Sequence, residues 1–142
     1  LENMVKTKIQ IRFADLDALG HVNNVNLQHY YDMGKGRYFQ EVLKLPLVWK
    51  REGFIQANTN TNYFVPVYIE DDLAVYTKVI RIGNKSFSFF QQLVDENTGT
   101  VKSESTSVLV GYDVKEQVSI ELLPEWREAI CRYERENGGA EL

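Results

Sequence analysis

Hydrophobic and polar residues alternate along much of the chain with the period of two that is typical of half-buried β-strands. In the first such segment, Val5–Phe13, apolar or β-branched side chains alternate with Lys6, Lys8, Gln10 and Arg12. Pro, Gly and Asn residues separate four later segments of strand-forming composition. These segments predict further strands over Phe54–Phe64, Leu73–Ile82, Ser86–Val94 and Val101–Tyr112. Since the connections between the last three are short, we expect those strands to be antiparallel neighbours.

One long segment has the period of a helix instead. Its apolar side chains recur three or four residues apart, at Leu27, Tyr30, Tyr31, Gly34, Tyr38, Phe39 and Val42. This spacing predicts an amphipathic helix over Val25–Lys44, with Asn23 or Asn24 able to cap its first turn. Gly34 and Gly36 each cost a helix about 1 kcal/mol relative to Ala. We therefore expect the helix backbone to pack closely against a sheet at these glycines.

A second, shorter helix is predicted near the end of the chain. Pro124 is a favoured first-turn residue, and the apolar face consists of Trp126, Ile130 and Tyr133, with Gly138 able to end the helix. The predicted order is one strand, one long helix, four antiparallel strands and a terminal helix. This is an α+β layout for a single domain over residues 1–142, in which one helix covers a sheet face.

Charge and cysteine content narrow the choice of partner and compartment. The formal net charge is −4 and the pI is about 5.2, which disfavours nucleic acid as a partner. No apolar stretch is long enough to span a bilayer. Cys131 is the single cysteine, so no internal disulfide can form, and no N-terminal apolar run resembles a signal peptide. We expect a cytoplasmic protein.

The segment from Asp15 to Asn24 holds two carboxylates, one imidazole and two amides, directly before the predicted long helix. Turn and cap preferences explain part of this density, because Asp and Asn favour turns and Gly20 can supply an unusual backbone angle. A functional site is the alternative explanation.

A calcium loop does not fit this segment. Asp15, Asp17 and Gly20 match the first, third and sixth positions of an EF-hand, but Leu19 at the fifth position has no side-chain oxygen. Asn26 takes the twelfth position, where a bidentate Glu is needed. With two histidines and one cysteine in the whole chain, we expect no metal site and no cofactor.

Serine or cysteine nucleophiles have little support. The chain lacks a GxSxG motif, and Cys131 lies among helix-packing residues. Ser103, Ser105 and Ser107 alternate on one face of the last long strand, and we expect strand propensity or solvent exposure to account for them rather than a site.

The remaining explanation for the polar residues from Asp15 to Asn24 is carboxylate chemistry beside the start of a helix. First-turn amides are unpaired and carry partial positive charge, so they can stabilise an oxyanion that develops on a carbonyl. A thioester suits this arrangement, because its carbonyl is electrophilic and its thiolate is a good leaving group. A carboxylate could then act as general base on water or as a transient nucleophile.

The chain resembles hot-dog-fold thioesterases of the 4-hydroxybenzoyl-CoA thioesterase-like group over nearly its whole length. Five segments carry the resemblance: Arg12–Asn24, Tyr30-Tyr31-Asp32, Tyr63–Pro66 with Asp72-Leu73, Lys85-Ser86-Phe87, and the strand that ends near Asp113. The resemblance implies a hot-dog fold, in which an antiparallel five-stranded sheet wraps one long central helix. It also implies a homodimer or homotetramer with active sites at the subunit interface.

The same resemblance assigns roles to individual residues. Asp17 matches the catalytic carboxylate, and the helix-start backbone formed by Asn23, Asn24 and Val25 matches the donor to the thioester oxygen. His21, like Asn23, falls on a position that is often polar in relatives and could orient substrate or water.

Three further residues have assignments of a different kind. Tyr63 is expected to shape the acyl pocket. Lys85 could contact a CoA phosphate, although a solvated turn lysine is the simpler interpretation. Another hot-dog branch takes its carboxylate from the central helix, where Asp32 is the candidate, but we interpret Asp32 as structural.

The loop is also similar to that of plant acyl-acyl carrier protein thioesterases, except that Leu19 replaces a catalytic Asn. The expected activity is hydrolysis of an acyl-CoA or acyl-carrier-protein thioester to free acid and thiol. Two alternatives stay open: a hot-dog hydratase or dehydratase, in which Asp17 and His21 transfer protons, and an acyl-binding module without catalysis.

Overall fold

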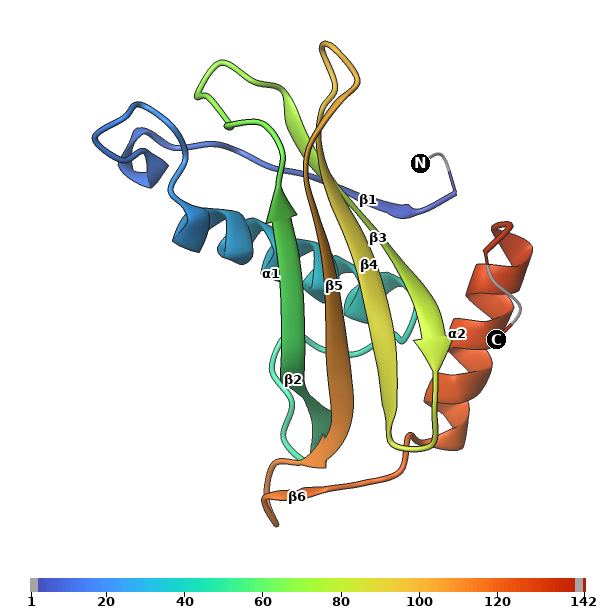
Figure 1. The fold of residues 1–142 in the computed structure, drawn as a ribbon. Coiled ribbons are helices and arrows are strands. Elements are labelled where there is room, and N and C mark those ends of the chain that lie inside the picture. The colour runs from blue at the N-terminus through green and yellow to red at the C-terminus, as the bar shows by residue number, and fades with distance from the viewer. Residues whose placement is uncertain (1–2, 140–141) are drawn as a thin grey trace.

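The computed structural model describes residues 3–139 and 142 and forms one antiparallel sheet with two α-helices (Figure 1). The elements in chain order are β1 (Val5–Lys8), a 3-10 helix (Phe13–Asp15), α1 (Asn24–Glu41), β2 (Glu52–Tyr63), β3 (Leu73–Ile82), β4 (Ser86–Asp95), β5 (Thr100–Asp113), β6 (Val118–Ser119) and α2 (Pro124–Glu136). The strand order is β1-β3-β4-β5-β2, and β6 pairs with the end of β5. The predicted α+β arrangement is confirmed.

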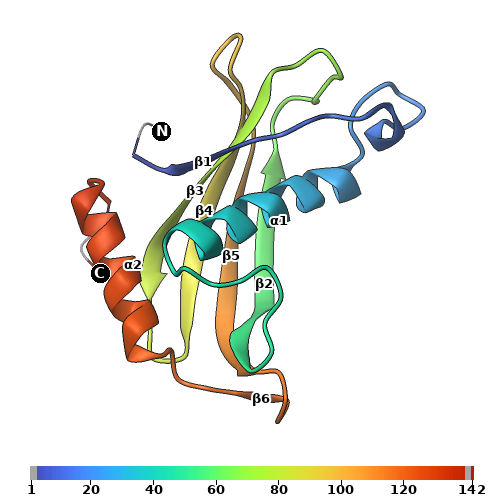
Figure 2. The ribbon, with the colours of Figure 1, turned by 180° about the vertical axis from the view of Figure 1, so that it is seen from behind.

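The long helix α1 crosses one face of the sheet, and α2 lies beside β3 near the same face (Figure 2). The buried side of α1 is the predicted apolar face, with Leu27, Tyr30, Tyr31, Tyr38 and Phe39 among its buried residues. The start of α1 lies at the end of the sheet where β2 finishes (Figure 1). The segment from Asp15 to Asn24, called the polar loop below, precedes α1 and therefore lies at this end of the sheet.

The structure departs most from the predicted elements at three places, and the other boundaries agree to within two residues. The first strand stops at Lys8, because Leu73 is the first residue of its partner β3 and accepts a last hydrogen bond from the Ile9 amide at 3.0 Å. The long helix ends at Glu41 rather than Lys44, whose φ is +56°. The sheet has six strands rather than the predicted five, because the two-residue strand β6 pairs with β5. This strand was not predicted.

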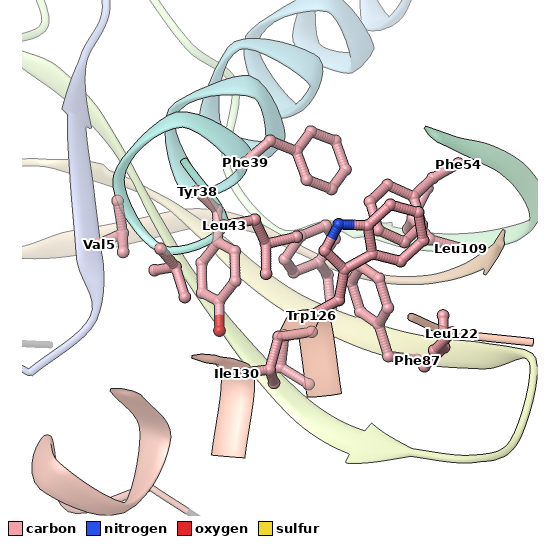
Figure 3. Close-up of a cluster of buried hydrophobic side chains, with 13 residues drawn as sticks. Val5, Tyr38, Phe39, Leu43, Phe54, Phe87, Leu109, Leu122, Trp126 and Ile130 are labelled. Carbon is pink, nitrogen blue, oxygen red and sulfur yellow. The ribbon is translucent and has the colours of Figure 1, made fainter. Parts of the chain in front are cut away.

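Two hydrophobic clusters lie between α1 and the sheet. The larger one joins the second half of α1 to α2, where Phe54 stacks on Phe39 with ring centroids 5.1 Å apart and contacts Trp126 at 4.5 Å (Figure 3). The smaller one lies under the start of α1 and consists of Ile9, Val22, Leu27, Tyr30, Tyr31, Val67, Leu73, Val75 and Leu93. This second cluster gives the polar loop a rigid base.

Of the two helix glycines, only Gly34 packs closely against the sheet. A Cβ atom built there would lie 2.8 Å from both Gln91 Nε2 and Thr77 Oγ1. A Cβ on Gly36 would meet nothing within 4 Å, so the prediction of close packing is wrong for that residue.

Strand propensity or solvent exposure was expected to account for the three serines of β5, and of these two explanations solvent exposure is wrong. Ser103, Ser105 and Ser107 are buried on the face that α1 covers. The Ser103 hydroxyl accepts a hydrogen bond from Tyr31 Oη at 2.6 Å and donates one to the Asn62 carbonyl at 2.9 Å. The small Ser103 side chain thus lies directly against Tyr31 of α1.

Candidate active site

The polar loop before α1 is closed at its base like a miniature hairpin. Leu16 and Val22 form an isolated antiparallel bridge, and the Asp17 amide donates to the His21 carbonyl at 2.8 Å. Gly20 has a φ of +80°, a left-handed conformation that strains other residues, and its amide donates to the Asp17 carbonyl at 3.0 Å. The loop therefore presents Asp17 and His21 on opposite sides of one tight turn.

The Asp17 side chain is exposed and held at one oxygen. Its Oδ1 accepts a hydrogen bond from the Leu19 amide at 2.9 Å. Its Oδ2 accepts no hydrogen bond from any other described residue. One carboxylate oxygen therefore orients the group, while the other is available to water or substrate.

Asp15, by contrast, is buried and anchors the loop. Its carboxylate accepts hydrogen bonds from Tyr30 Oη at 2.6 Å, from the Arg12 amide at 3.1 Å and from the Arg12 guanidinium at 3.0 Å. Burial alone would raise the pKa of Asp15, but the hydrogen bonds from Tyr30 and Arg12 outweigh it, so the net shift of the pKa is downward. Asp15 stays ionised and structural.

At the start of α1, one backbone amide has no acceptor in the part of the chain that the structure describes. Asn23 caps the helix, since its Oδ1 accepts from the Val25 amide at 2.8 Å and its carbonyl accepts from the Asn26 and Leu27 amides. The Asn24 amide has no acceptor among the described residues, because the residue four positions earlier lies in the loop. This N–H is the free donor that the helix start offers to a ligand.

A surface cavity of about 310 Å³ lies between the loop, the start of α1 and the segment that follows β2. Its polar lining comes from the loop and helix start, and its apolar lining comes mainly from residues 63–67. The lining residues are Asp17, His21, Val22, Asn23, Asn24, Leu27, Tyr63, Phe64, Val65, Pro66 and Val67. A carboxylate, an imidazole and a helix start thus face one half-apolar cavity.

The segment after β2 is tied to the polar loop on two sides. The Val22 amide donates to the Val67 carbonyl at 2.8 Å. The rings of His21 and Tyr68 meet edge to face, at 90° with centroids 5.1 Å apart. The position of the His21 imidazole therefore depends on the segment after β2. Phe64 to Val67 of this segment form the apolar wall of the cavity.

Most of the predicted site residues come together in this cavity. Asp17, His21, Asn23 and Asn24 all line it, and Tyr63 closes one side, where its hydroxyl accepts a hydrogen bond from Gln28 Nε2 at 3.1 Å. The roles predicted for these residues stay predictions.

Two predicted residues lie away from the cavity. The Val25 side chain is 60% exposed and does not line it, although the Val25 amide belongs to the helix start. Lys85 lies in the turn between β3 and β4, at the end of the sheet opposite the polar loop (Figure 1). Within one chain, Lys85 is not brought to the site.

Asp32 and the paired tyrosines also lie outside the cavity. Asp32 is on another face of α1, where it accepts from the buried Lys35 ammonium at 3.3 Å. Tyr30 and Tyr31 turn inward, where their hydroxyls donate to Asp15 and Ser103.

Gln28, Val67 and Tyr68 contribute to the site but were not predicted. Gln28 occupies the same helix face as Asn24, one turn later, and this spacing is the signal that could have identified it. Val67 and Tyr68 lie in an irregular segment, where periodicity carries no information.

Neither a metal site nor a membrane-spanning helix is found in the part of the chain that the structure describes. No three His, Cys, Asp or Glu side chains among residues 3–139 and 142 are grouped to hold a metal ion. None of the described helices is long and apolar enough to cross a membrane.

Known proteins share this sequence pattern and this fold. The family model of the thioesterase-like superfamily matches residues 11–131. The long-chain acyl-CoA thioesterase FadM of Escherichia coli is 24% identical over 127 residues, which make up 89% of this chain and 96% of FadM.

Two solved structures extend this similarity. A Thermus thermophilus thioesterase complexed with coenzyme A and Zn has a TM-score of 0.83 and 26% identity, covering 95% of this chain and 98% of its own. A Staphylococcus aureus protein in complex with CoA also has a TM-score of 0.83, covering 98% and 94% of the two chains. Because it is only 15% identical, it supports the hot-dog fold alone.

Proposed function

Because the chain belongs to the thioesterase-like superfamily and is thereby a thioester hydrolase, we propose that it cleaves acyl-CoA thioesters in the cavity beside Asp17. FadM acts on long-chain acyl-CoA, and the Thermus thermophilus relative was solved with coenzyme A. These two relatives support CoA as the thiol carrier.

In the proposed reaction, Asp17 supplies the carboxylate. As general base, its free oxygen takes a proton from water while the water oxygen attacks the carbonyl carbon. The tetrahedral intermediate then collapses, the carbon–sulfur bond breaks, and the proton passes to the departing thiolate. As nucleophile, the same oxygen would bond to the acyl carbon while the carbon–sulfur bond breaks, which gives a mixed anhydride and the thiolate. Water then cleaves the anhydride, which releases the acid and restores the Asp17 carboxylate, and the proton set free passes to the thiolate. Both routes use the same carboxylate oxygen.

The helix start supplies the oxyanion donor. The Asn24 amide points out of the first turn of α1 and has no acceptor among the described residues. At this position it carries the partial positive charge of the helix end. A carbonyl oxygen that develops negative charge there would be stabilised without any movement of the protein.

One observation carries the proposal: Asp17 and Asn24 line the same cavity, and in the described part of the chain one Asp17 oxygen and the Asn24 amide have no hydrogen-bond partner. His21 lines the same cavity, where it could orient water or substrate. The apolar wall from Phe64 to Val67 offers contact surface to an acyl or pantetheine chain.

Replacing Asp17 with Asn tests the assignment. We expect D17N to lower kcat about 100- to 10,000-fold, because the amide cannot accept a proton from water. Thermal unfolding should be close to that of the wild type, since the Asn oxygen can still accept from the Leu19 amide. Free thiol would be measured with a thiol reagent across short, long and aromatic acyl-CoAs.

The matched control is D32N, which removes a carboxylate from another face of α1. We expect this variant to retain its activity. Normal turnover in D17N with loss in D32N would transfer the role to Asp32. Binding of acyl-CoA without thiol release in the wild type would favour an acyl-binding module, and hydration of an enoyl-CoA would favour a hydratase.

We further propose that two chains associate through the β2 edges. The strand has 12 residues, pairs on one side only within the described chain, and contains no Lys or Pro to block association. The opposite edge, β1, has four residues and carries Lys6 and Lys8.

We also propose that the protein is cytoplasmic, because its single cysteine, Cys131, allows no internal disulfide.

A further inference from the structure

Lys102 occupies an irregular position in β5. The pairing of β4 with β5 joins Leu93 to Ser103 and Val94 to Val101, so Lys102 is an extra residue without a partner on β4. An extra residue of this kind forms a β-bulge, which redirects a side chain. Lys102 is 6% exposed, although lysine is rarely buried unless its charge is paired.

The redirected side chain binds the segment that follows β2. Its ammonium donates to the Pro66 carbonyl at 2.9 Å and pairs with Asp71 Oδ2 at 3.1 Å. The same ammonium lies 5.4 Å from the centroid of the Tyr68 ring. The segment from Pro66 to Asp71 therefore closes around one buried cation.

The Lys102 backbone holds the beginning of the same segment. Its carbonyl accepts from the Phe64 amide at 3.0 Å and from the Val65 amide at 3.1 Å. Both residues line the cavity. One residue of β5 thus fixes the apolar wall through its main chain and its side chain.

The contact chain continues to the imidazole of the site. Tyr68 has the Lys102 ammonium over its ring and the His21 ring against it, edge to face at 5.1 Å. Asp71 Oδ2 also accepts from the Tyr68 amide at 2.9 Å, so the turn that carries Tyr68 is itself held by the Lys102–Asp71 pair.

We propose that Lys102 is a positioning residue of the site. It holds the apolar wall and, through Tyr68, fixes the orientation of the His21 imidazole. The effect on catalysis depends on the proposed thioesterase function, whereas the effect on His21 does not.

Four variants test this role. K102M keeps the aliphatic stem and removes the charge, K102R restores a charge, and Y68L removes the ring between Lys102 and His21. K78M is the matched control, because the Lys78 ammonium also lies over an aromatic ring, that of Phe90 at 5.7 Å, away from the cavity.

The first readout is NMR of the two histidines. His21 and His29 are the only histidines in the chain, and His29 lies on another face of α1, so it serves as an internal reference. We expect cross-relaxation between the rings of His21 and Tyr68 in the wild type. It should be lost or weakened in K102M, with movement of the His21 ring signals, whereas the His29 signals should remain in place.

The second readout is acyl-CoA hydrolysis. We expect K102M and Y68L to lower kcat/KM by about 10- to 100-fold, since small displacements of positioned groups cost up to about 100-fold. K102R should recover part of the loss, and K78M should match the wild type.

The outcomes separate the two proposals. If K102M is folded and both its His21 signals and its kcat/KM are those of the wild type, the positioning role is wrong. It is equally wrong if K78M has the same effects as K102M. If K102M does not fold, Y68L decides through catalysis: a wild-type kcat/KM in folded Y68L would contradict the positioning role. If the wild type releases no thiol while K102M still displaces His21, the positioning role stands and the proposed function fails.

Discussion

Asp15 and Asp17 are two residues apart in the sequence and have different environments. Asp15 is 1% exposed and accepts three hydrogen bonds, which lower its pKa despite its burial. Asp17 is exposed, and among the described residues its carboxylate accepts a hydrogen bond from the Leu19 amide alone. At the scale of single residues, therefore, the first carboxylate holds the loop and the second is free for chemistry.

The Asn23 cap provides a test at the same scale. Asn23→Ala should destabilise the protein by about 0.5–2 kcal/mol, because the Val25 amide loses its acceptor at the helix start. Chemical denaturation would measure the difference. Asn24→Ala is the control, since no hydrogen bond of the Asn24 side chain occurs among the described residues, and an equal loss in both variants would contradict the role of Asn23 as cap.

Much of this residue-level arrangement could be predicted from the sequence. The polar loop, the cap and the helix face follow from local composition and periodicity, and the resemblance separated Asp17 from Asp15. Lys102 could not be predicted, because the alternation of β5 places it with Glu104 on the outward face. Only the bulge opposite Leu93 and Val94 turns it inward, and no local sequence pattern reveals such a bulge.

At the scale of elements, the contact between α1 and the sheet depends on one glycine. A methyl group on Gly34 would lie 2.8–2.9 Å from Gln91, Thr77 and Val75, whereas one on Gly36 would be free. We expect Gly34→Ala to destabilise the fold by about 1–3 kcal/mol through overpacking. Gly36→Ala should stabilise it by up to about 1 kcal/mol through helix propensity. Thermal unfolding checks both signs, and equal effects would contradict the packing.

The edge strand β1 is held to its neighbours by a cluster around Glu96. Lys6, Lys8 and Tyr76 bind the Glu96 carboxylate at 2.7, 2.8 and 2.6 Å. Hydrogen bonds from Lys6, then Lys8 and Tyr76, lower the pKa of Glu96 from 4.5 to about 2. The cluster therefore joins β1 to β3 and to the end of β4.

This cluster predicts a dependence of stability on pH. Because the pKa of Glu96 is lower in the folded state, its stabilisation is complete above about pH 4.5 and is lost as the pH falls towards 2. As the pH falls from about 4.5 to 2, the free energy of unfolding should decrease more steeply in the wild type than in Glu96→Gln. Glu70→Gln, which changes an exposed carboxylate, should follow the wild type. Identical slopes in the wild type and Glu96→Gln would refute the prediction.

At the scale of the whole molecule, the two sheet edges differ. The β1 edge is short and basic, whereas the β2 edge is long and free of Lys and Pro. Lys85 lies far from the cavity of its own chain, so a role at a CoA phosphate would require the cavity of another subunit. Such a role could not be tested from the sequence, because it depends on how chains assemble.

Light scattering after gel filtration tests the assembly. We expect a mass of about twice the 16.5 kDa of one chain, or a higher even multiple. Asn60→Lys, which places a charge in the middle of β2, should shift the mass towards one chain. Asn97→Lys, in the turn between β4 and β5, should not. A wild-type mass of one chain would contradict association through β2.

The bridge between Leu16 and Val22 has a consequence for evolution. Below it, Asp15 and the helix cap are locked by their own hydrogen bonds, while above it Ala18 and Leu19 are exposed, with Leu19 at 77%. New side chains at these two positions would meet solvent or substrate and leave the fold undisturbed. Evolution and laboratory selection can therefore change the side chains at Ala18 and Leu19 beside the cavity, while the bridge between Leu16 and Val22 keeps the rest of the loop in place.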